Sequence, residues 1–171
     1  PREHLACGKL KGASREGNDL ESDLDVTYAT IMQEIVATGV APHYAELAPR
    51  LGISPNEALN RIESILAVTP GWMHPGTDYI ASFPPFNNQP TAYRITVRGE
   101  QRWFAQCGFE ALACSWMFPG EIVDINAPCL LGDDSLHLKM KDGELVLVDP
   151  ETIVGYTRSR LGMEEPDQPF R

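Results

Sequence analysis

The spacing of apolar residues changes once along this chain, and the change limits the folds open to it. Up to Leu66 the apolar residues recur every three or four positions, which predicts amphipathic helices. From Asp78 onward they alternate with polar residues in short runs, which predicts strands. A helical part followed by a strand-rich part predicts an α+β protein.

The first part begins with an arm and two helices. Residues 1–20 are polar and unpatterned, and we expect a flexible arm there. Ser22 or Asp23 is a suitable cap for a helix that ends at Gly39. The stretch HYAELAPRLG, residues 43–52, predicts a second, short helix that its last glycine ends.

A third helix has the strongest start signal of the chain. Ser54 precedes Pro55 at the first helical position, and Glu57 follows three residues after the cap, which predicts a capping box. Three helices with a tight LGIS turn between the last two are typical of a helix-turn-helix. We therefore expect a three-helix, winged-helix-like lobe over residues 21–76.

The second part predicts a sheet interrupted by one helix. Six runs alternate as strands do: DYIASF, YRITVR, QRWFAQ, EIVDIN, SLHLKMK and ELVLVD. The KDG between the last two runs is a hairpin signal. A helix is expected from about Cys107 to Met117. We predict a mixed, mostly antiparallel sheet packed on this central helix over residues 77–160, followed by a tail at 161–171.

The charge of the chain excludes several classes of partner. The net charge is −10 and the isoelectric point is about 4.8. Between Asp19 and Ala67 two arginines stand against eight acids, which leaves −6 in the expected lobe. Phosphate and anionic membrane surfaces attract clustered Lys and Arg, so we expect no nucleic-acid partner and no membrane binding. The lobe is then a structural or dimerising element, and a homodimer is compatible with it.

The cysteines indicate a reducing compartment. Cys7, Cys107, Cys114 and Cys129 are irregularly spaced, and no CxxC pair is present that would suggest a zinc ribbon. A small secreted scaffold would contain more cysteine. We expect a cytoplasmic protein with free thiols, and each thiol taken alone also fits a small buried apolar side chain.

One group of residues has the composition of a reactive site. Cys107 stands at the expected start of the central helix, with Glu110 three and Cys114 seven residues later, on one helical face. The helix dipole lowers the pKa of a thiol in the first turn, and a partly desolvated carboxyl has a raised pKa and can donate a proton. This predicts a reactive cysteine with an acid beside it; core packing is the alternative.

The residues around this group resemble a known family. The stretch ASFPPFNNQPTAYRITVRGEQRWFAQCGFEALACSWMFPG resembles the alkylmercury lyases, whose helix opens with a Cys-x-x-Asp tetrad. Here the tetrad is Cys107-Gly-Phe-Glu110, and the family's FPG…C pattern corresponds to Phe118–Gly120 and Cys129. The resemblance spans roughly residues 23–148 and is most specific over residues 83–119.

The resemblance implies a reaction and site residues. Family members hold the mercury of R–Hg⁺ with two cysteine thiolates, the ligands that a very soft cation prefers, and an acid protonates the leaving carbon. Cys107 would be the first catalytic cysteine and Glu110 the acid, with Cys129 a structural cysteine. No cofactor is implied; mercury is substrate or product.

The sequence departs from the family in two places. Glu110 replaces aspartate, which moves the proton by about 1 Å, and such shifts can cost about a hundredfold in rate. The family's second catalytic cysteine lies farther downstream, and no cysteine follows Cys129 here. Cys114 or Cys129 substitutes, or another chain supplies the thiol, or this homologue does not cleave carbon–mercury bonds.

Three hypotheses follow from these observations. The first is an organomercurial-lyase-like enzyme or degenerate enzyme that uses Cys107 and Glu110. The second is a non-catalytic module in which Cys107, Cys114 and Cys129 bind a soft metal or small ligand. The third is an acidic structural protein that acts only with a protein partner.

Overall fold

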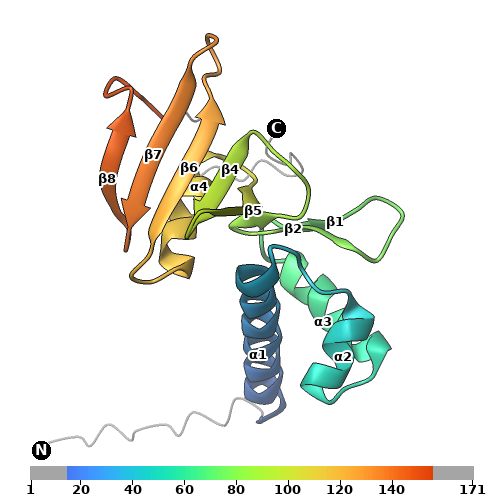
Figure 1. Ribbon diagram of the computed structural model, residues 1–171. Helices are drawn as coiled ribbons and strands as arrows, with labels where there is room; N and C mark the ends of the chain where they lie inside the picture. The colour runs from blue at the N-terminus through green and yellow to red at the C-terminus, as the bar shows by residue number, and fades with distance from the viewer. Residues whose placement is uncertain (1–14, 156–171) are drawn as a thin grey trace, which may run out of the picture.

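The computed structural model describes residues 15–155, and side chains from Ser22 onward (Figure 1). Its helices are α1 (Arg15–Thr38), α2 (Tyr44–Leu51), α3 (Pro55–Leu66), α4 (Gly108–Ala113) and the short 3-10 helix η1 (Cys114–Met117). Its strands are β1 (Trp72–Met73), β2 (Ile80–Phe83), β3 (Phe86–Asn87), β4 (Tyr93–Val97), β5 (Glu100–Ala105), β6 (Ile122–Pro128), β7 (Ser135–Lys141) and β8 (Glu144–Asp149). The chain is therefore α+β, as predicted.

Helix α1 begins earlier than the sequence indicated. It starts at Arg15, so the predicted start at Ser22 or Asp23 is wrong, and residues 15–20 of the expected arm are helical. The rest of that arm, with Cys7, lies outside the described residues, as does the expected tail at 161–171. The predicted end is confirmed, because the Gly39 N–H bonds to the Ile35 carbonyl at 2.8 Å with Gly39 in a left-handed conformation.

Helices α2 and α3 occupy the predicted positions, but their caps differ from expectation. In α2 the complete capping box is formed by His43 and Glu46. In α3 the Ser54 hydroxyl accepts the N–H of Glu57, while the Glu57 carboxylate bonds to Arg61 instead of returning to the cap. The box predicted at Ser54 is therefore only half formed, because a cation competes for its acid.

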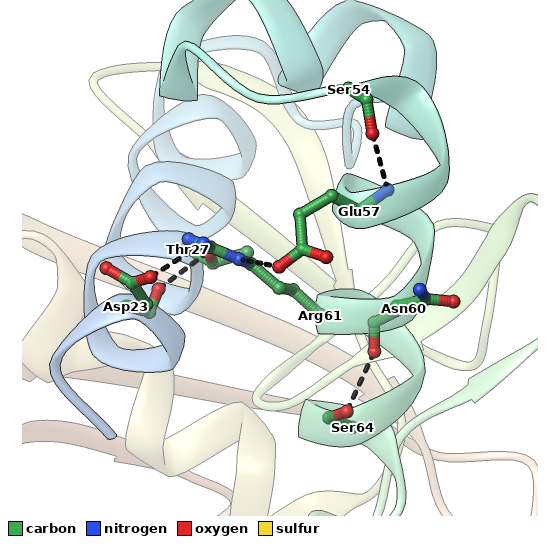
Figure 2. A network of polar contacts seen from close by, with 7 residues as sticks. All are labelled: Asp23, Thr27, Ser54, Glu57, Asn60, Arg61 and Ser64. Atoms are coloured by element: carbon green, nitrogen blue, oxygen red, sulfur yellow. Dashed lines mark hydrogen bonds and ion pairs between the residues drawn. The ribbon is translucent and has the colours of Figure 1, made fainter. Parts of the chain in front are cut away.

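Polar contacts tie α3 to α1. Arg61 Nη2 lies 2.6 Å from an Asp23 carboxylate oxygen, and Arg61 Nε lies 2.8 Å from a Glu57 carboxylate oxygen (Figure 2). The Arg61 side chain is only 13% exposed, so its charge depends on these two carboxylates. The three-helix arrangement agrees with the prediction, and its winged-helix character stays a prediction.

The strands form one sheet in the order β1-β2-β3-β5-β4-β6-β7-β8. Every pairing in this sheet is antiparallel, so the expectation of a mixed sheet is wrong. Consecutive strands joined by short turns pair antiparallel, since a parallel pair needs a long crossover, and the non-consecutive pairs β3–β5 and β4–β6 are antiparallel as well. The prediction also missed β1 and β3, which have two residues each and are too short to show alternation.

Two tight hairpins set the register of the sheet. Arg98 and Gly99 join β4 to β5, and Asp142 and Gly143 join β7 to β8, all four with positive φ. Turns of this kind match the right-handed twist of the strands they connect, which is why glycine follows in both. The hairpin predicted from KDG is confirmed.

The helical lobe and the sheet share one hydrophobic core. Trp103 of β5 donates its indole N–H to the Ile35 carbonyl of α1 at 2.7 Å, and the rings of Tyr28 and Phe83 lie 5.1 Å apart. Fully burying one such side chain stabilises a fold by roughly 1.5–3 kcal/mol. The core therefore crosses the boundary expected near residue 76, and β1, which precedes that boundary, is part of the sheet.

Helix α4 packs against β4 and β5 of this sheet. In Figure 1 the helices α1–α3 gather on one side, while α4 lies beside the strands near β4 and β6. The predicted helix from Cys107 to Met117 is divided, because the backbone tightens into η1 at Cys114. None of the helices in residues 15–155 is long and apolar enough to cross a membrane.

Candidate functional site

The site is built where β5 leaves the sheet. Ala105, the last residue of β5, is fully buried and pairs with Tyr93 of β4. Gln106 and Cys107 follow, and the chain then turns into α4. Cys107 is the N-cap of that helix, with an extended backbone (φ −146°, ψ 176°) and no capping hydrogen bond from its side chain. Its half-buried thiol is therefore not used to hold the helix.

Glu110 stands beside this thiol. The Cys107 thiol and the backbone N–H groups of Cys107 and Gln106 act to lower the pKa of its carboxyl. One carboxyl oxygen, Oε2, is buried and has no hydrogen-bond partner among the described residues. Burial raises the pKa of Glu110, more than these contacts lower it. The raised pKa agrees with the sequence prediction and lets the carboxyl hold a proton.

The pKa of Cys107 differs from the prediction. Burial of the thiol raises its pKa, and the negative charge of Glu110 adds to the increase. The N–H groups of Glu110 and Phe109 favour the thiolate, as a helix N-terminus should, but they do not outweigh the burial. The expected lowering is therefore wrong, since α4 has only six residues and its start is partly desolvated.

Cys114 lies at the junction of α4 and η1. It is completely buried, and burial raises its pKa strongly, with the charge of Glu110 adding to the effect. The influence of Glu110 on both Cys107 and Cys114 agrees with the expected common face of the helix. Cys114 behaves as an unionised thiol in the core next to the acid.

Cys129 leaves the sheet at the same end as Cys107. Strands β5 and β6 both run antiparallel to β4, so the last residues of both strands lie at the same end of the sheet, beside the start of β4. Strand β4 separates them, which places β5 and β6 about 10 Å apart. The Cys129 N–H bonds to the Asp134 carbonyl at 2.8 Å, which holds the loop after β6.

The described residues do not assemble the predicted set of three ligands. Within residues 15–155 no group of three or more Cys, His, Asp or Glu side chains is placed to hold a metal ion, and no disulfide links Cys107, Cys114 and Cys129. The reason is visible in the fold, because Cys129 follows a strand that is not adjacent to β5. Cys107, Glu110 and Cys114 all belong to α4 and its two ends, whereas Cys129 follows β6.

Sequence reasoning missed two residues next to the site. Gln106 places its side-chain Oε1 2.5 Å from the hydroxyl of Ser82, a residue of β2 that is fully buried. Gln106 Nε2 also lies 3.4 Å from the Pro70 carbonyl. The only sequence signal was a glutamine beside the reactive cysteine, and the partners are 24 and 36 residues away.

Comparisons with known proteins agree with this fold. The family model described as alkylmercury lyase matches residues 86–166. A solved structure, "Crystal structure of the mercury-bound form of MerB2", is similar in fold, with a TM-score of 0.57 and 17% sequence identity. The similarity covers 78% of this chain and 68% of that one. No curated protein sequence matches.

The matched region contains the strands β3 to β8, helix α4, and both Cys107 and Glu110. Over residues 86–166, this chain is similar in sequence to the alkylmercury lyase family.

Proposed function

We propose that this protein is a carbon–mercury lyase in which Cys107 captures the mercury of an organomercurial and Glu110 protonates the carbon. The observation that carries the proposal is the Glu110 carboxyl, which stands three residues after Cys107 at the start of α4 and buries one oxygen without a hydrogen-bond partner among the described residues. Such an oxygen is costly unless it serves a purpose. We infer that the Glu110 carboxyl is kept in this costly environment because it exchanges a proton with the thiol and then with the carbon.

The proton balance follows from the two raised pKa values. Cys107 starts as a thiol, and its proton passes to the Glu110 carboxylate as sulfur bonds to mercury and displaces the anion that R–Hg⁺ carries. Glu110 then donates this proton to the carbon. The carbon–mercury bond breaks with its electron pair going to carbon, so R–H leaves and Hg²⁺ remains on sulfur. Proton transfer by a positioned side chain contributes about 10²- to 10⁴-fold in rate.

We assign the second thiol of the reaction to Cys114. It is the other described cysteine whose pKa the Glu110 charge raises. Because Glu110 already holds the Cys107 proton when the second sulfur bonds to mercury, the Cys114 proton leaves to solvent. Seven residues span about 10 Å along a straight helix, so one mercury atom reaches both sulfurs only if η1 moves toward Cys107. A second thiolate raises the electron density on carbon and favours its protonation.

A binding module is the second candidate, and the burial of Cys114 favours it. Without movement of η1, mercury has one thiol and one carboxyl as ligands, which fits capture without cleavage. In either case we infer a small organometallic or soft-metal ligand. A cytoplasmic location and a homodimer remain expectations, and the surplus of acids in the lobe continues to argue against a nucleic-acid partner.

Hydrocarbon release separates the two candidates. The purified chain is incubated with phenylmercury and excess small thiol, and benzene is measured by gas chromatography for the parent and for Cys107→Ser, Cys114→Ser and Cys129→Ser. We expect release by the parent and by Cys129→Ser, and loss of release in the other two variants. A stable phenylmercury adduct without benzene would support binding alone, and absence of any adduct on Cys107 would refute both candidates.

A further inference from the structure

Helix η1 is fastened to the turn between β7 and β8. Its residue Trp116 is 66% exposed, yet the indole lies on the backbone of Gly143, where an alanine methyl group would overlap the ring. Just after η1, the Gly120 N–H donates a hydrogen bond to the Asp142 carboxylate at 2.6 Å. Both residues of the β7–β8 turn therefore contact the segment to which Cys114 belongs.

The Cys114 side chain is enclosed by this arrangement. Helix η1 packs against β6 and β7, and neither Cys114 nor Ser115 has exposed area. On either side of η1 the chain is anchored in the core by Ala111 and Phe118, and the Phe118 ring lies 4.8 Å from that of Trp103. A reagent or a metal ion therefore reaches the Cys114 sulfur only when η1 leaves the sheet between these two anchors.

The two tight hairpin turns of the sheet differ in their contacts. Arg98-Gly99 and Asp142-Gly143 have the same positive-φ conformation. A Cβ at Gly99 would meet no described atom within 4 Å beyond its chain neighbours, whereas a Cβ at Gly143 would meet the indole. Arg98 contacts the segment after η1 through an ion pair with Glu121, which is exposed and contributes little to stability. The absence of a side chain at Gly143 thus serves packing as well as turn conformation.

We propose that Trp116 and Asp142 are positioning residues that fasten η1 to the β7–β8 turn, and that Cys114 becomes available to a soft metal when this fastening opens. For the part of Cys114 in the reaction, the inference rests on the proposed function. The fastening itself is a property of this chain and is tested without any mercury compound.

The test is the rate at which methyl methanethiosulfonate, a small neutral thiol reagent, labels Cys114 at constant pH, with each cysteine followed by peptide mapping. Trp116→Ala removes the indole, and Gly143→Ala displaces it. We expect either variant to raise the Cys114 rate at least about tenfold, because a buried group reacts through local opening of the structure. The Cys107 rate in the same samples should change less than about twofold, since η1 does not hold the start of α4.

Gly99→Ala is the matched control for Gly143→Ala. It introduces the same methyl group at the same turn position without meeting the indole, and it should leave the Cys114 rate at the parent's value. Asp142→Gly removes the carboxylate without straining the positive φ, and it should raise the rate roughly threefold. Asp142→Asn keeps an acceptor oxygen for the Gly120 N–H and should restore the parent's rate.

Low concentrations of urea separate the release of η1 from unfolding of the whole protein. Local opening exposes little surface, so the Cys114 rate in Trp116→Ala should hardly depend on urea, whereas labelling through global unfolding rises steeply. A steep dependence, equal acceleration by Gly143→Ala and Gly99→Ala, or no acceleration by Trp116→Ala would overturn the inference. If Gly143→Ala does not fold, Trp116→Ala decides the outcome, because its side chain is on the surface.

Benzene release from phenylmercury is a separate readout. If the parent releases benzene, Trp116→Ala should release it severalfold faster in a single turnover, because Cys114 reaches the mercury sooner, and Gly99→Ala should match the parent. An unchanged or slower release by Trp116→Ala would contradict a role for the opening in the reaction. If the parent releases no benzene, the proposed function fails, and the labelling rates still decide whether η1 is fastened in this way.

Discussion

Glu57 in α3 and Glu110 in α4 occupy the same place in their helices, three residues after the N-cap, but their surroundings are opposite. Ser54 caps α3 through the N–H of Glu57, and the Glu57 carboxylate, 43% exposed, accepts a hydrogen bond from Arg61 (Figure 2). Cys107 makes no capping bond, and Glu110 has no cation beside it and one buried oxygen without a partner in the described chain.

The contrast shows how one local pattern serves two purposes. At Glu57 the charge is neutralised by a cation that also binds Asp23, and the result is a link between two helices. At Glu110 the charge is left next to a thiol, and burial raises the pKa of the acid. The start of α4 has neither the side-chain cap nor the ion pair found in α3. We expect this to make α4 less stable and to leave Glu110 available as a proton donor.

The largest effect is expected from removing the acid. Glu110→Gln keeps the shape of the side chain but has no transferable proton, so benzene release from phenylmercury should fall at least about 100-fold. Glu57→Gln is the matched control at the equivalent position and should retain full release per folded molecule. Equal activity in the two variants would show that Glu110 has no chemical role.

The next effect concerns the ion pairs of the lobe. Arg61→Met removes a nearly buried cation and leaves Asp23 and Glu57 without their partner, which should destabilise the protein by about 1–3 kcal/mol in urea unfolding. Labelling of Cys107 should keep the parent's pH profile. A change in that profile would mean that the lobe and the site are coupled.

The two N-caps should respond in opposite directions. Ser54→Ala loses the bond to the Glu57 N–H and should cost about 1 kcal/mol. Cys107→Ser introduces a good cap where none exists, so stability should stay level or rise by a few tenths of a kcal/mol. Both are measured by thermal melting, and a destabilised Cys107→Ser would indicate that the thiol is a packing group.

The smallest effect is a pH-dependent difference in stability. Since the pKa of Glu110 is raised by burial, its protonated form favours the folded state below about pH 4, and this contribution is lost as pH rises through the folded-state pKa. Gln does not titrate. The melting temperature of Glu110→Gln relative to the parent, measured by thermal melting, should therefore increase from pH 4 to pH 7.

Much of the fold follows from local signals. The KDG hairpin, the helix end at Gly39 and the start of α3 at Ser54 depend on residues adjacent in sequence, and all three are confirmed. The start of α1 and the strands β1 and β3 were missed. A two-residue strand has no period to detect, and its existence depends on the strands it pairs with.

The site was predictable in its members but not in its electrostatics. Helical spacing was enough to place Cys107 with Glu110 and Cys114. The direction of the Cys107 pKa was not predictable, because it depends on burial by distant segments rather than on the helix start alone. Gln106 was missed for the same reason, since its partner Ser82 comes from another strand.

The most direct test of the central claim is a single-turnover experiment with one equivalent of phenylmercury, quenched at intervals and analysed by intact mass and peptide mapping. The account predicts that phenylmercury appears on Cys107 and decays to protein-bound Hg²⁺ as one equivalent of benzene is released, and that in Glu110→Gln the adduct on Cys107 persists. Phenylmercury found first on Cys129, or benzene released from Glu110→Gln as fast as from the parent, would contradict it.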